Sequence, residues 1–508
     1  MKIEGIILLT YIISLSILFI FGAHGFNMIW HYFKTYNKRT DDLSEEELVM
    51  TEFPIVTIQI PLFNERYVIK RLIDTVIRFD YPQDKIEFQI LDDSTDDSTE
   101  IIKEIIKPHL ENGFDITHIH RTNREGYKAG ALKEGLKTAK GEYVAIFDAD
   151  FIPRKKFLLR TLPYFKFDKM LGLVQTRWEH LNRDYSILTK TQAIALDGHF
   201  VIEQAVRNRA GYFINFNGTG GIWKKECILD AGNWETDTLT EDLDLSYRAQ
   251  MRGWKFKYLV NFTSPAELPA DISALKSQQF RWTKGAIETA KKIFPKVLRS
   301  NMPFKEKLQS FIHLCSNLAY PFILLAAILN FPVLLIKQGG NYETTFKYMS
   351  VFVFAFVSSF MFYLYSQKDV YEDWQQRIIY FPVFMAGSMG LSVNNTKAVF
   401  EGLFNKKSEF VRTPKYKIVS KGDKWEDKSY VQKKIPFTTY IETFMAIYCF
   451  CGVVTAFVTA QIAAIPFQLM FFSGFAMMSV LTIKQVVTSN RAIAKRIKEN
   501  KESELQTA

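Results

Sequence analysis

The stretch Tyr143-Val144-Ala145-Ile146-Phe147-Asp148-Ala149-Asp150-Phe151 decides the fold that we predict for this chain. Its first five residues are apolar, and Gly141 and Pro153 bound the run, which is typical of a buried strand. In an open α/β sheet, ligands bind beyond the carboxyl ends of the strands. Two carboxylates at such an end can share a hard divalent cation that also binds phosphate. The alternative is a strand followed by an ordinary Asp-rich turn.

Segments with strand and helix patterns alternate along this part of the chain. Strands are expected at 56–61, 88–91, 118–120, 174–178 and 213–223. One helix is expected at 66–78, and another, which follows the second strand, is expected to end at about Lys107. Alternation with short connections predicts an α/β fold with a mostly parallel sheet. The glycines at 218–221 predict a bend in the last strand, where backbone could approach a ligand.

Polar side chains follow three of these strands. They are Asn64-Glu65, Asp92-Asp93 and the pair Asp148 and Asp150. Because the carboxyl ends of parallel strands lie at one edge of a sheet, we expect these side chains to converge although they are far apart in sequence. For each of them the alternative is a helix N-cap, for which a single aspartate would suffice.

Two further motifs open expected helices. Lys128 lies between Gly126 and Gly130, where it could bind a phosphate as a point charge or could be a solvated lysine. Thr240-Glu241-Asp242 begins a later helix. There Thr240 is a plausible N-cap, and the ordinary role of Asp242 would be to interact favourably with the helix dipole.

The motif Gln278-Gln279-Phe280-Arg281-Trp282 lies in a polar helical stretch. Trp282 offers a flat surface for a sugar ring, and Arg281 can donate two hydrogen bonds to a phosphate. The alternative is the face of an ordinary interfacial helix.

Long apolar runs lie at both ends of the 508-residue chain, whose formal net charge is +10. Five runs are long enough to cross a bilayer: 6–26, 308–336, 348–365, 437–460 and 462–483. A cleaved signal peptide is the alternative for the first, although its apolar core is long for that role. The four cysteines suggest no disulfide framework and are expected to be small buried hydrophobes: Cys227, Cys315, Cys449 and Cys451.

A shorter apolar segment, 378–391, precedes a strongly basic segment that runs to about Lys434. If the short segment crossed the membrane, the basic segment would lie outside, against the positive-inside rule. We therefore expect an in-plane interfacial helix, five spanning helices and a cytoplasmic catalytic domain, with six spans as the alternative. The basic segment lies between membrane helices and lacks an aromatic stacking pattern, which argues against a nucleic-acid partner.

These features predict seven parts. In order they are an N-terminal transmembrane helix (1–30), a linker (31–53), a catalytic domain (54–300), a transmembrane helix pair (301–366), an interfacial helix with a basic loop (367–436), a second transmembrane pair (437–487) and a basic cytoplasmic tail (488–508).

The ordered set of motifs resembles that of membrane-integrated family 2 glycosyltransferases of the cellulose synthase type. The set comprises Pro61-Leu62-Phe63-Asn64-Glu65, Asp92-Asp93-Ser94, Lys128-Ala129-Gly130-Ala131-Leu132, Asp148-Ala149-Asp150, Thr240-Glu241-Asp242 and Gln278-Gln279-Phe280-Arg281-Trp282. Segments 91–96, 216–223 and 278–282 are most similar to the cellulose-synthase-like mannan and glucan synthases of plants. The resemblance implies a GT-A-type α/β domain flanked by transmembrane and interfacial helices.

The resemblance also implies residue roles. Asp242 would be the general base, and Asp92 is grouped with it as catalytic. Either Asp92 or its neighbour Asp93 would contact the nucleotide base or ribose. Asp148 and Asp150 would hold the sugar nucleotide through Mg²⁺ or Mn²⁺.

The remaining implied residues would bind substrate. Arg281 would meet the pyrophosphate, and Trp282 would lie under the acceptor sugar. Residues 410–415 are a partial match to the Phe-x-Val-Thr-x-Lys gating loop of cellulose synthases, because Val directly follows Phe and Arg412 intervenes before Thr. The alternative is a basic loop on anionic lipid headgroups. The other predicted substrate-binding residues are Glu65, Lys128, Gln278, Thr413 and Lys415.

The predicted activity is that of a processive inverting β-glycosyltransferase. It would polymerise hexose units from GDP-mannose or UDP-glucose onto a growing glycan, giving a β-mannan, glucomannan or β-glucan, and pass the chain across the membrane. One alternative is non-processive transfer to a membrane lipid, giving a glycosyl-ceramide or glycosyl-diacylglycerol. Another is a transporter or scaffold with a degenerate domain, which the intact set of aspartates argues against. No residue distinguishes glucose from mannose.

Overall fold

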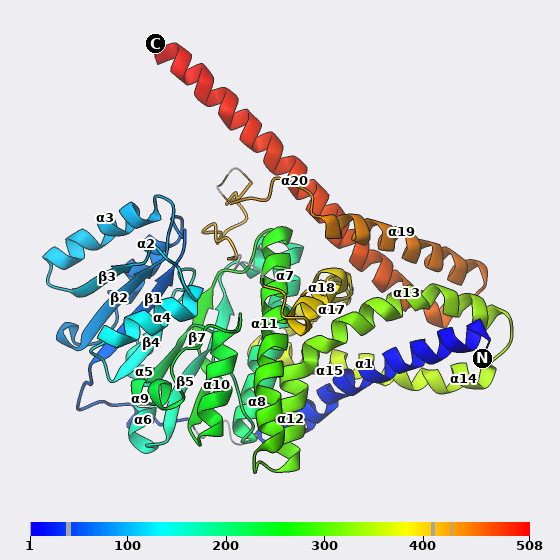
Figure 1. Ribbon diagram of the computed structural model, residues 1–508, viewed down its shortest axis with the longest axis horizontal. Coiled ribbons are helices and arrows are strands. Elements are labelled where there is room, and N and C mark those ends of the chain that lie inside the picture. The colour runs from blue at the N-terminus through cyan, green and yellow to red at the C-terminus, as the bar shows by residue number, and fades with distance from the viewer. Residues whose placement is uncertain (1, 37–41, 408–411, 427, 429, 508) are drawn as a thin grey trace.

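The structure, a computed structural model, describes residues 2–36, 42–407, 412–426, 428 and 430–507. A sheet-containing α/β part lies at one end of the molecule and a group of long helices at the other (Figure 1). Between them lie three helices, α11 (Ile272–Arg299), α17 (Phe381–Gly390) and α18 (Ser392–Leu403).

The α/β part is built on one seven-stranded sheet with the strand order β3-β2-β1-β4-β6-β5-β7. The strands are β1 (Val56–Leu62), β2 (Ile86–Asp92), β3 (Asp115–His120), β4 (Tyr143–Ile146), β5 (Leu171–His180), β6 (Gly221–Lys224) and β7 (Lys255–Ala266). Only β6 runs antiparallel to its neighbours, so the predicted mostly parallel α/β sheet is confirmed.

Helices cover both faces of this sheet, which explains why the central strand β4 is apolar on both sides. Along β4, Ala145 packs into the core on one face, and Val144 and Ile146 pack into the core on the other. The first core includes residues of α2 (Ile69–Val76) and α3 (Ser98–Glu111). The second includes residues of α4 (Tyr127–Thr138), α9 (Lys225–Asp230) and α10 (Glu241–Met251).

Shorter helices complete the α/β part. They are η2 (Gln83–Lys85), α5 (Phe157–Thr161), α6 (Tyr164–Phe167), η3 (Arg183–Tyr185), α7 (Ile187–Asp197), the π-helix η4 (Gly198–Glu203) and α8 (Gln204–Arg209).

The predicted strand 213–223 is largely wrong, because only Gly221–Lys224 joins the sheet. Side chains of α10 take the place of a partner strand for the preceding residues. Gln250 accepts from the Ile214 N–H at 3.1 Å and donates to its carbonyl at 2.7 Å, and the Ser246 hydroxyl accepts from the Phe216 N–H at 2.8 Å. The predicted bend is present, since Gly218 has a φ of +79°.

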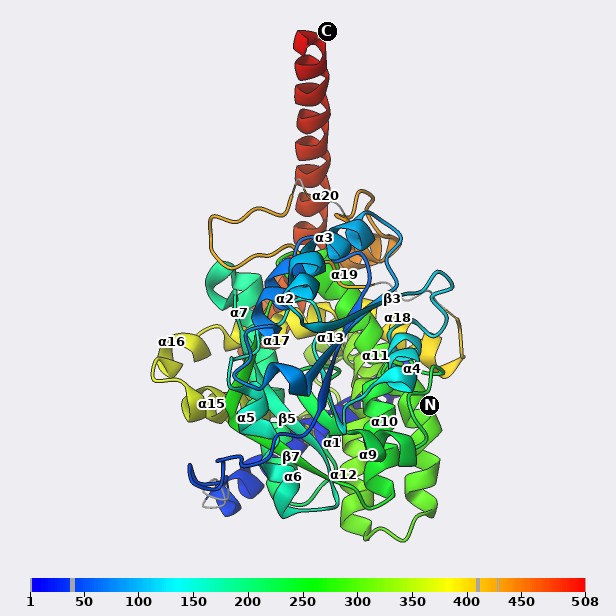
Figure 2. The same cartoon turned by 90° about the vertical axis from the view of Figure 1, so that its left-hand side faces the viewer.

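Five helices or helix pairs among the described residues are long and apolar enough to cross a membrane, the number expected from the sequence. They are α1 (Ile3–Lys34), α12 (Phe304–Cys315) continued through η5 (Ser316–Leu318) by α13 (Ala319–Gln338), α14 (Glu343–Met349) continued through η6 (Ser350–Phe352) by α15 (Val353–Val370), α19 (Phe437–Val458), and the segment Ile462–Lys495, comprising η7 (Ile462–Ala464) and the start of α20 (Ile465–Thr507). The far end of α20 projects from the body of the molecule in both views (Figures 1 and 2).

The segment predicted to be interfacial forms α16 (Trp374–Ile378) and α17. With 10 residues, α17 reaches about 15 Å, half the thickness of a bilayer core. It packs closely on α20: a Cβ on Gly474 would lie 2.1 Å from the carbonyl oxygen of Ala386. Three cysteines are buried as expected, but Cys451 is exposed on α19, and none of the four is in a disulfide.

Polar contacts attach α11 to two of the candidate membrane-spanning helices, α19 and α20. The Lys276 ammonium contacts the Glu442 carboxylate of α19 at 2.6 Å and the Thr482 hydroxyl of α20 at 2.8 Å. Asp271 caps α11 by accepting from the Ala274 N–H at 2.8 Å, and Gln485 of α20 donates to the same carboxylate at 2.8 Å. The helix that carries the Gln278–Trp282 motif is therefore fixed between the two parts of the molecule.

Candidate active site

One cleft at the carboxyl edge of the sheet gathers almost all of the predicted site residues. Eleven of them line it: Glu65, Asp93, Lys128, Asp148, Asp150, Asp242, Gln278, Arg281, Trp282, Thr413 and Lys415. The remaining one, Asp92, does not. The strand-end argument therefore predicted the location of the cleft.

Asp148 and Asp150, at the end of β4, each contact a lysine. The Lys128 ammonium lies 2.6 Å from Asp148 Oδ1 and donates to the Gly218 carbonyl at 2.8 Å. The Lys415 ammonium lies 2.6 Å from Asp150 Oδ2. Although burial opposes it, the neighbouring aspartate raises the pKa of each lysine, so both remain cationic. Two carboxylates that hold positive charge at one strand end fit a divalent cation with oxygen ligands.

Asp242 lies in the first turn of α10, and its Oδ1 accepts from the Leu243 N–H at 2.8 Å. Burial and the nearby Glu241 raise the pKa of Asp242 to about 7, and Lys128 and Arg281 oppose this rise. Thr240 occupies the N-cap position as predicted, but its hydroxyl pairs with Thr289 at 3.0 Å and forms no cap. A carboxylate with a pKa near neutrality suits general-base catalysis.

Gln278, Arg281 and Trp282 lie one helical turn apart on α11, so they face the cleft together. Gln278 and Trp282 also line a second cavity, which extends between α7, α11, α13, α15, α17 and α20. Leu196 is shared by the two cavities as well. The end of the cleft at α11 therefore adjoins a space that is lined in part by candidate membrane-spanning helices.

Asp92, which was grouped with the catalytic residues, is fully buried and does not line the cleft. Its Oδ2 accepts from the Thr99 hydroxyl at 2.8 Å and lies 3.1 Å from His118 Nε2. These hydrogen bonds outweigh the burial and hold the pKa of Asp92 well below its usual range. Asp93 lines the cleft and pairs with Arg121 through both oxygens, at 2.7 and 2.5 Å.

Part of the basic loop between α18 and α19 covers the cleft. Arg412 pairs with Glu65 at 2.8 Å, and the Tyr416 N–H donates to Glu267 Oε1 at 3.0 Å. Burial raises the pKa of Glu65 to about 7, which Arg412 opposes. Phe410 and Val411, the first residues of the gating-like motif, lie outside the described part of the chain.

The lining residues that were not predicted include Arg124, Trp178, His180 and Asn217. Trp178 and His180 lie at the carboxyl end of β5, which runs parallel to β4 because both are antiparallel to β6. The strand-end rule could therefore have found them. Asn217 lies in an irregular segment, where no periodicity identifies a residue.

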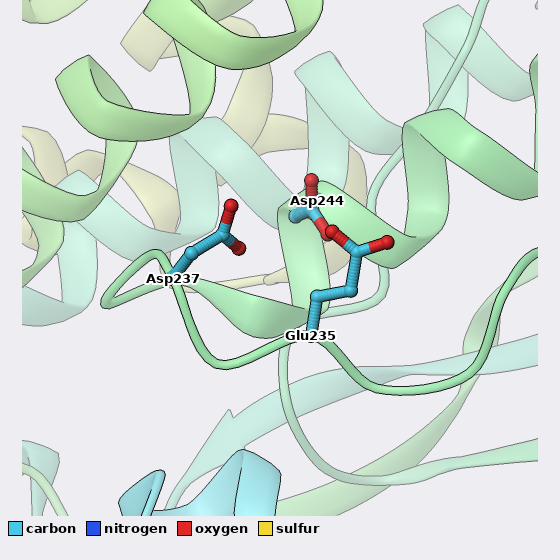
Figure 3. Close-up of side chains that lie close together, drawn as sticks. All are labelled: Glu235, Asp237 and Asp244. Carbon is cyan, nitrogen blue, oxygen red and sulfur yellow. The ribbon is translucent and has the colours of Figure 1, made fainter.

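A second acidic group lies outside the cleft, on α10 and the loop before it (Figure 3). Carboxylate oxygens of Glu235, Asp237 and Asp244 lie within 4.8 Å of one another. Lys292 contacts all three, at 2.7 Å from Asp237 and 3.0 Å from Asp244, and Arg248 pairs with Asp244 at 2.7 Å. Because Lys292 of α11 and Arg248 of α10 pair with these carboxylates, the group joins α10 to α11 through ion pairs.

Residues 54–285 match a family model described as "Glycosyltransferase like family 2". This segment is a family 2 glycosyltransferase domain. The family 2 domain contains every cleft residue predicted from the sequence except Thr413 and Lys415, which the loop supplies.

Curated relatives include glucomannan 4-beta-mannosyltransferase 1 of Oryza sativa subsp. japonica, which is 41% identical over 268 residues, 52% of this chain and 51% of the relative. Glucomannan 4-beta-mannosyltransferase 9 of Arabidopsis thaliana is 39% identical over 322 residues, 60% of each protein. The chain thus spans about half the length of the curated relatives it matches.

Among solved structures, the chain resembles mannosyltransferase PcManGT from Pyrobaculum calidifontis, solved with GDP-Man and Mn²⁺. The TM-score is 0.53 at 19% identity, covering 78% of this chain and all of the other. At this identity the likeness concerns the fold alone, and it confirms the predicted GT-A-type α/β architecture.

Proposed function

We propose that this protein is a processive inverting β-glycosyltransferase. It would transfer hexose units from a nucleotide sugar to a growing glycan and pass the product across the membrane. The observation that carries the proposal is the cleft, where Asp242, Lys128, Asp148 and Arg281 meet. The names of the plant relatives favour mannose, and hence GDP-mannose over UDP-glucose, with a β-mannan or glucomannan as product.

In the proposed mechanism, Asp242 accepts the proton of the acceptor hydroxyl. The acceptor oxygen bonds to the anomeric carbon as the bond from that carbon to the diphosphate breaks, so the configuration inverts. Lys128, Lys415 and Arg281 stabilise the charge of the departing diphosphate. Asp148 and Asp150 would hold Mg²⁺ or Mn²⁺, which when bound supplies further positive charge for the diphosphate. In this mechanism Asp93 would contact the nucleoside, and Trp282 would lie under the acceptor sugar.

The second cavity supports polymer export over glycosylation of a lipid. It begins at Gln278 and Trp282 and continues past Tyr320 of α13, Tyr363 of α15 and Met478 of α20. A chain held at the acceptor end of the cleft would therefore enter a space between membrane helices, and aromatic walls suit the faces of sugar rings.

The proposed activity is tested with purified protein in lipid vesicles, offered GDP-mannose and UDP-glucose in turn with Mg²⁺ or Mn²⁺. Products are sized and digested with linkage-specific hydrolases. A long β-linked polymer from one donor supports the proposal and identifies the sugar. A single hexose on extracted lipid would contradict processivity, but the roles proposed for Asp242, Asp148 and Asp150 in the transfer step would be unchanged.

We further propose that the family 2 domain and the basic loop face the cytoplasm. Lys421 is exposed in the loop. If it is replaced by cysteine, an impermeant thiol reagent should not label it in sealed right-side-out vesicles and should label it after permeabilisation. The parent has its own exposed Cys451, so that residue is first replaced by serine. Labelling at position 421 in sealed vesicles would favour six spans.

Transfer should fall at acid pH. Asp242 must be unprotonated to accept a proton, and its pKa is raised to about 7. The active fraction is therefore present above pH 7 and lost below it, by about tenfold for each pH unit. The measurement is kcat/KM for transfer across this range, with donor affinity as the control. A flat profile between about pH 5.5 and 7.5 would show that another group takes the proton.

A further inference from the structure

Asn217 lines the cleft and lies in the irregular segment before β6. The next two residues in the chain, Gly218 and Thr219, contact residues of the proposed reaction centre. The Gly218 carbonyl accepts from Lys128 at 2.8 Å, and the Thr219 hydroxyl accepts from the Asp148 N–H at 2.9 Å. The segment that carries Asn217 is therefore attached to Lys128 and Asp148 of the proposed reaction centre.

The orientation of the Asn217 amide is determined by three donors. Its Oδ1 lies 3.1 Å from His199 Nε2, 3.2 Å from Gln204 Nε2 and 3.0 Å from Asn215 Nδ2. Its Nδ2 is buried and has no hydrogen-bond acceptor in the part of the chain that the structure describes. Buried donors are almost always satisfied, so an acceptor from outside the protein is expected here.

A partly exposed ion pair contacts the oxygen side of this amide. His199 Nδ1 lies 2.9 Å from Glu203 Oε2, and both residues belong to the π-helix η4. Burial opposes a charge on His199, but the hydrogen bonds to Glu203 and Asn217 raise its pKa, and in the charged form both ring nitrogens donate. The π-helix packs on α15, since a Cβ on Gly198 would lie 2.4 Å from the Tyr363 ring. Single π-turns of this kind occur often at functional sites.

We infer that Asn217 is a substrate-binding residue whose amide group donates a hydrogen bond to an oxygen of the hexose at the reaction centre. His199, held by Glu203, is a positioning residue that keeps the amide turned toward the sugar. This inference rests on the proposed transfer reaction. The hexose can belong to the donor or to the acceptor, since both meet at this point.

The decisive substitution is Asn217→Asp. It keeps an oxygen for the three donors and exchanges the amide group for a second oxygen, so the local fold is preserved while the donated bond is lost. We expect kcat/KM for transfer to fall about tenfold to a hundredfold. Asn112→Asp, the same exchange at an exposed helix end in the same domain, should leave transfer unchanged.

Hydrolysis of the donor in the absence of acceptor separates the two sources of the hexose. If hydrolysis falls with transfer, Asn217 contacts the donor hexose; if only transfer falls, it contacts the acceptor. Transfer within twofold of the parent would overturn the inference. An inactive parent would instead refute the proposed function, so the two failures are distinguishable.

Two substitutions at His199 provide a test that survives if Asn217→Asp does not fold. Gln places an N–H donor where His199 Nε2 lies, and Phe removes it. We expect His199→Phe to lower transfer as Asn217→Asp does and His199→Gln to restore most of it, at unchanged melting temperature. Equal losses in both variants would show that the ion pair only stabilises the fold and would overturn the positioning role.

Discussion

Replacing Asp242 by Asn is expected to lower transfer by about a hundredfold to ten-thousandfold while donor affinity stays close to that of the parent. The amide keeps the size of the carboxylate and can still accept from the Leu243 N–H, but it cannot take a proton. Because burial already raises the pKa of Asp242, a neutral group is well tolerated at this position. The fold should therefore be unaffected.

The measurement pairs a transfer assay with calorimetric titration of the nucleotide sugar. Asp84→Asn, the same exchange at a residue whose side chain is 76% exposed, is the matched control and should behave as the parent does. Transfer near the parent rate in the Asp242 variant would refute its role as the base. Lost donor affinity would instead indicate that Asp242 binds the donor.

Replacing Asp150 by Asn should lower transfer by at least about a hundredfold and abolish its response to Mn²⁺ or Mg²⁺. The substitution removes one of the two carboxylates at the end of β4 and leaves the Lys415 ammonium, 2.6 Å away in the parent, without its carboxylate partner. The loop that carries Lys415 should then cover the cleft less firmly. Transfer is measured against metal concentration, and Mn²⁺ binding is followed directly by electron paramagnetic resonance.

The acidic group outside the cleft supplies the control for this experiment. Asp237→Asn removes a carboxylate that pairs with Lys292 at 2.7 Å, and it should leave the metal response unchanged (Figure 3). The reverse result, with the metal response lost in Asp237→Asn and kept in Asp150→Asn, would show that the metal binds the acidic group outside the cleft. It would contradict the proposed metal site at Asp148 and Asp150.

The sequence by itself determined the location of the cleft. Parallel strands deliver their carboxyl ends to one edge, so Glu65, Asp93 and Asp148 could be placed together before any contact was known. The apolar runs likewise determined the five candidate spans, because length and composition alone decide whether a helix can cross a bilayer. The ordered motifs identified the family, which the match over residues 54–285 confirms.

Only the tertiary structure decided which member of the Asp92-Asp93 pair faces the cleft. Successive residues at a strand end point to opposite sides: the Asp92 carboxylate contacts His118 and His120 of β3, and Asp93 lines the cleft. The contact between Lys415 and Asp150, which are 265 positions apart, is likewise seen only in the tertiary structure, because it depends on a loop anchored between helices. Asn217 became visible in the same way: its amide orientation comes from three side chains whose convergence no local pattern records.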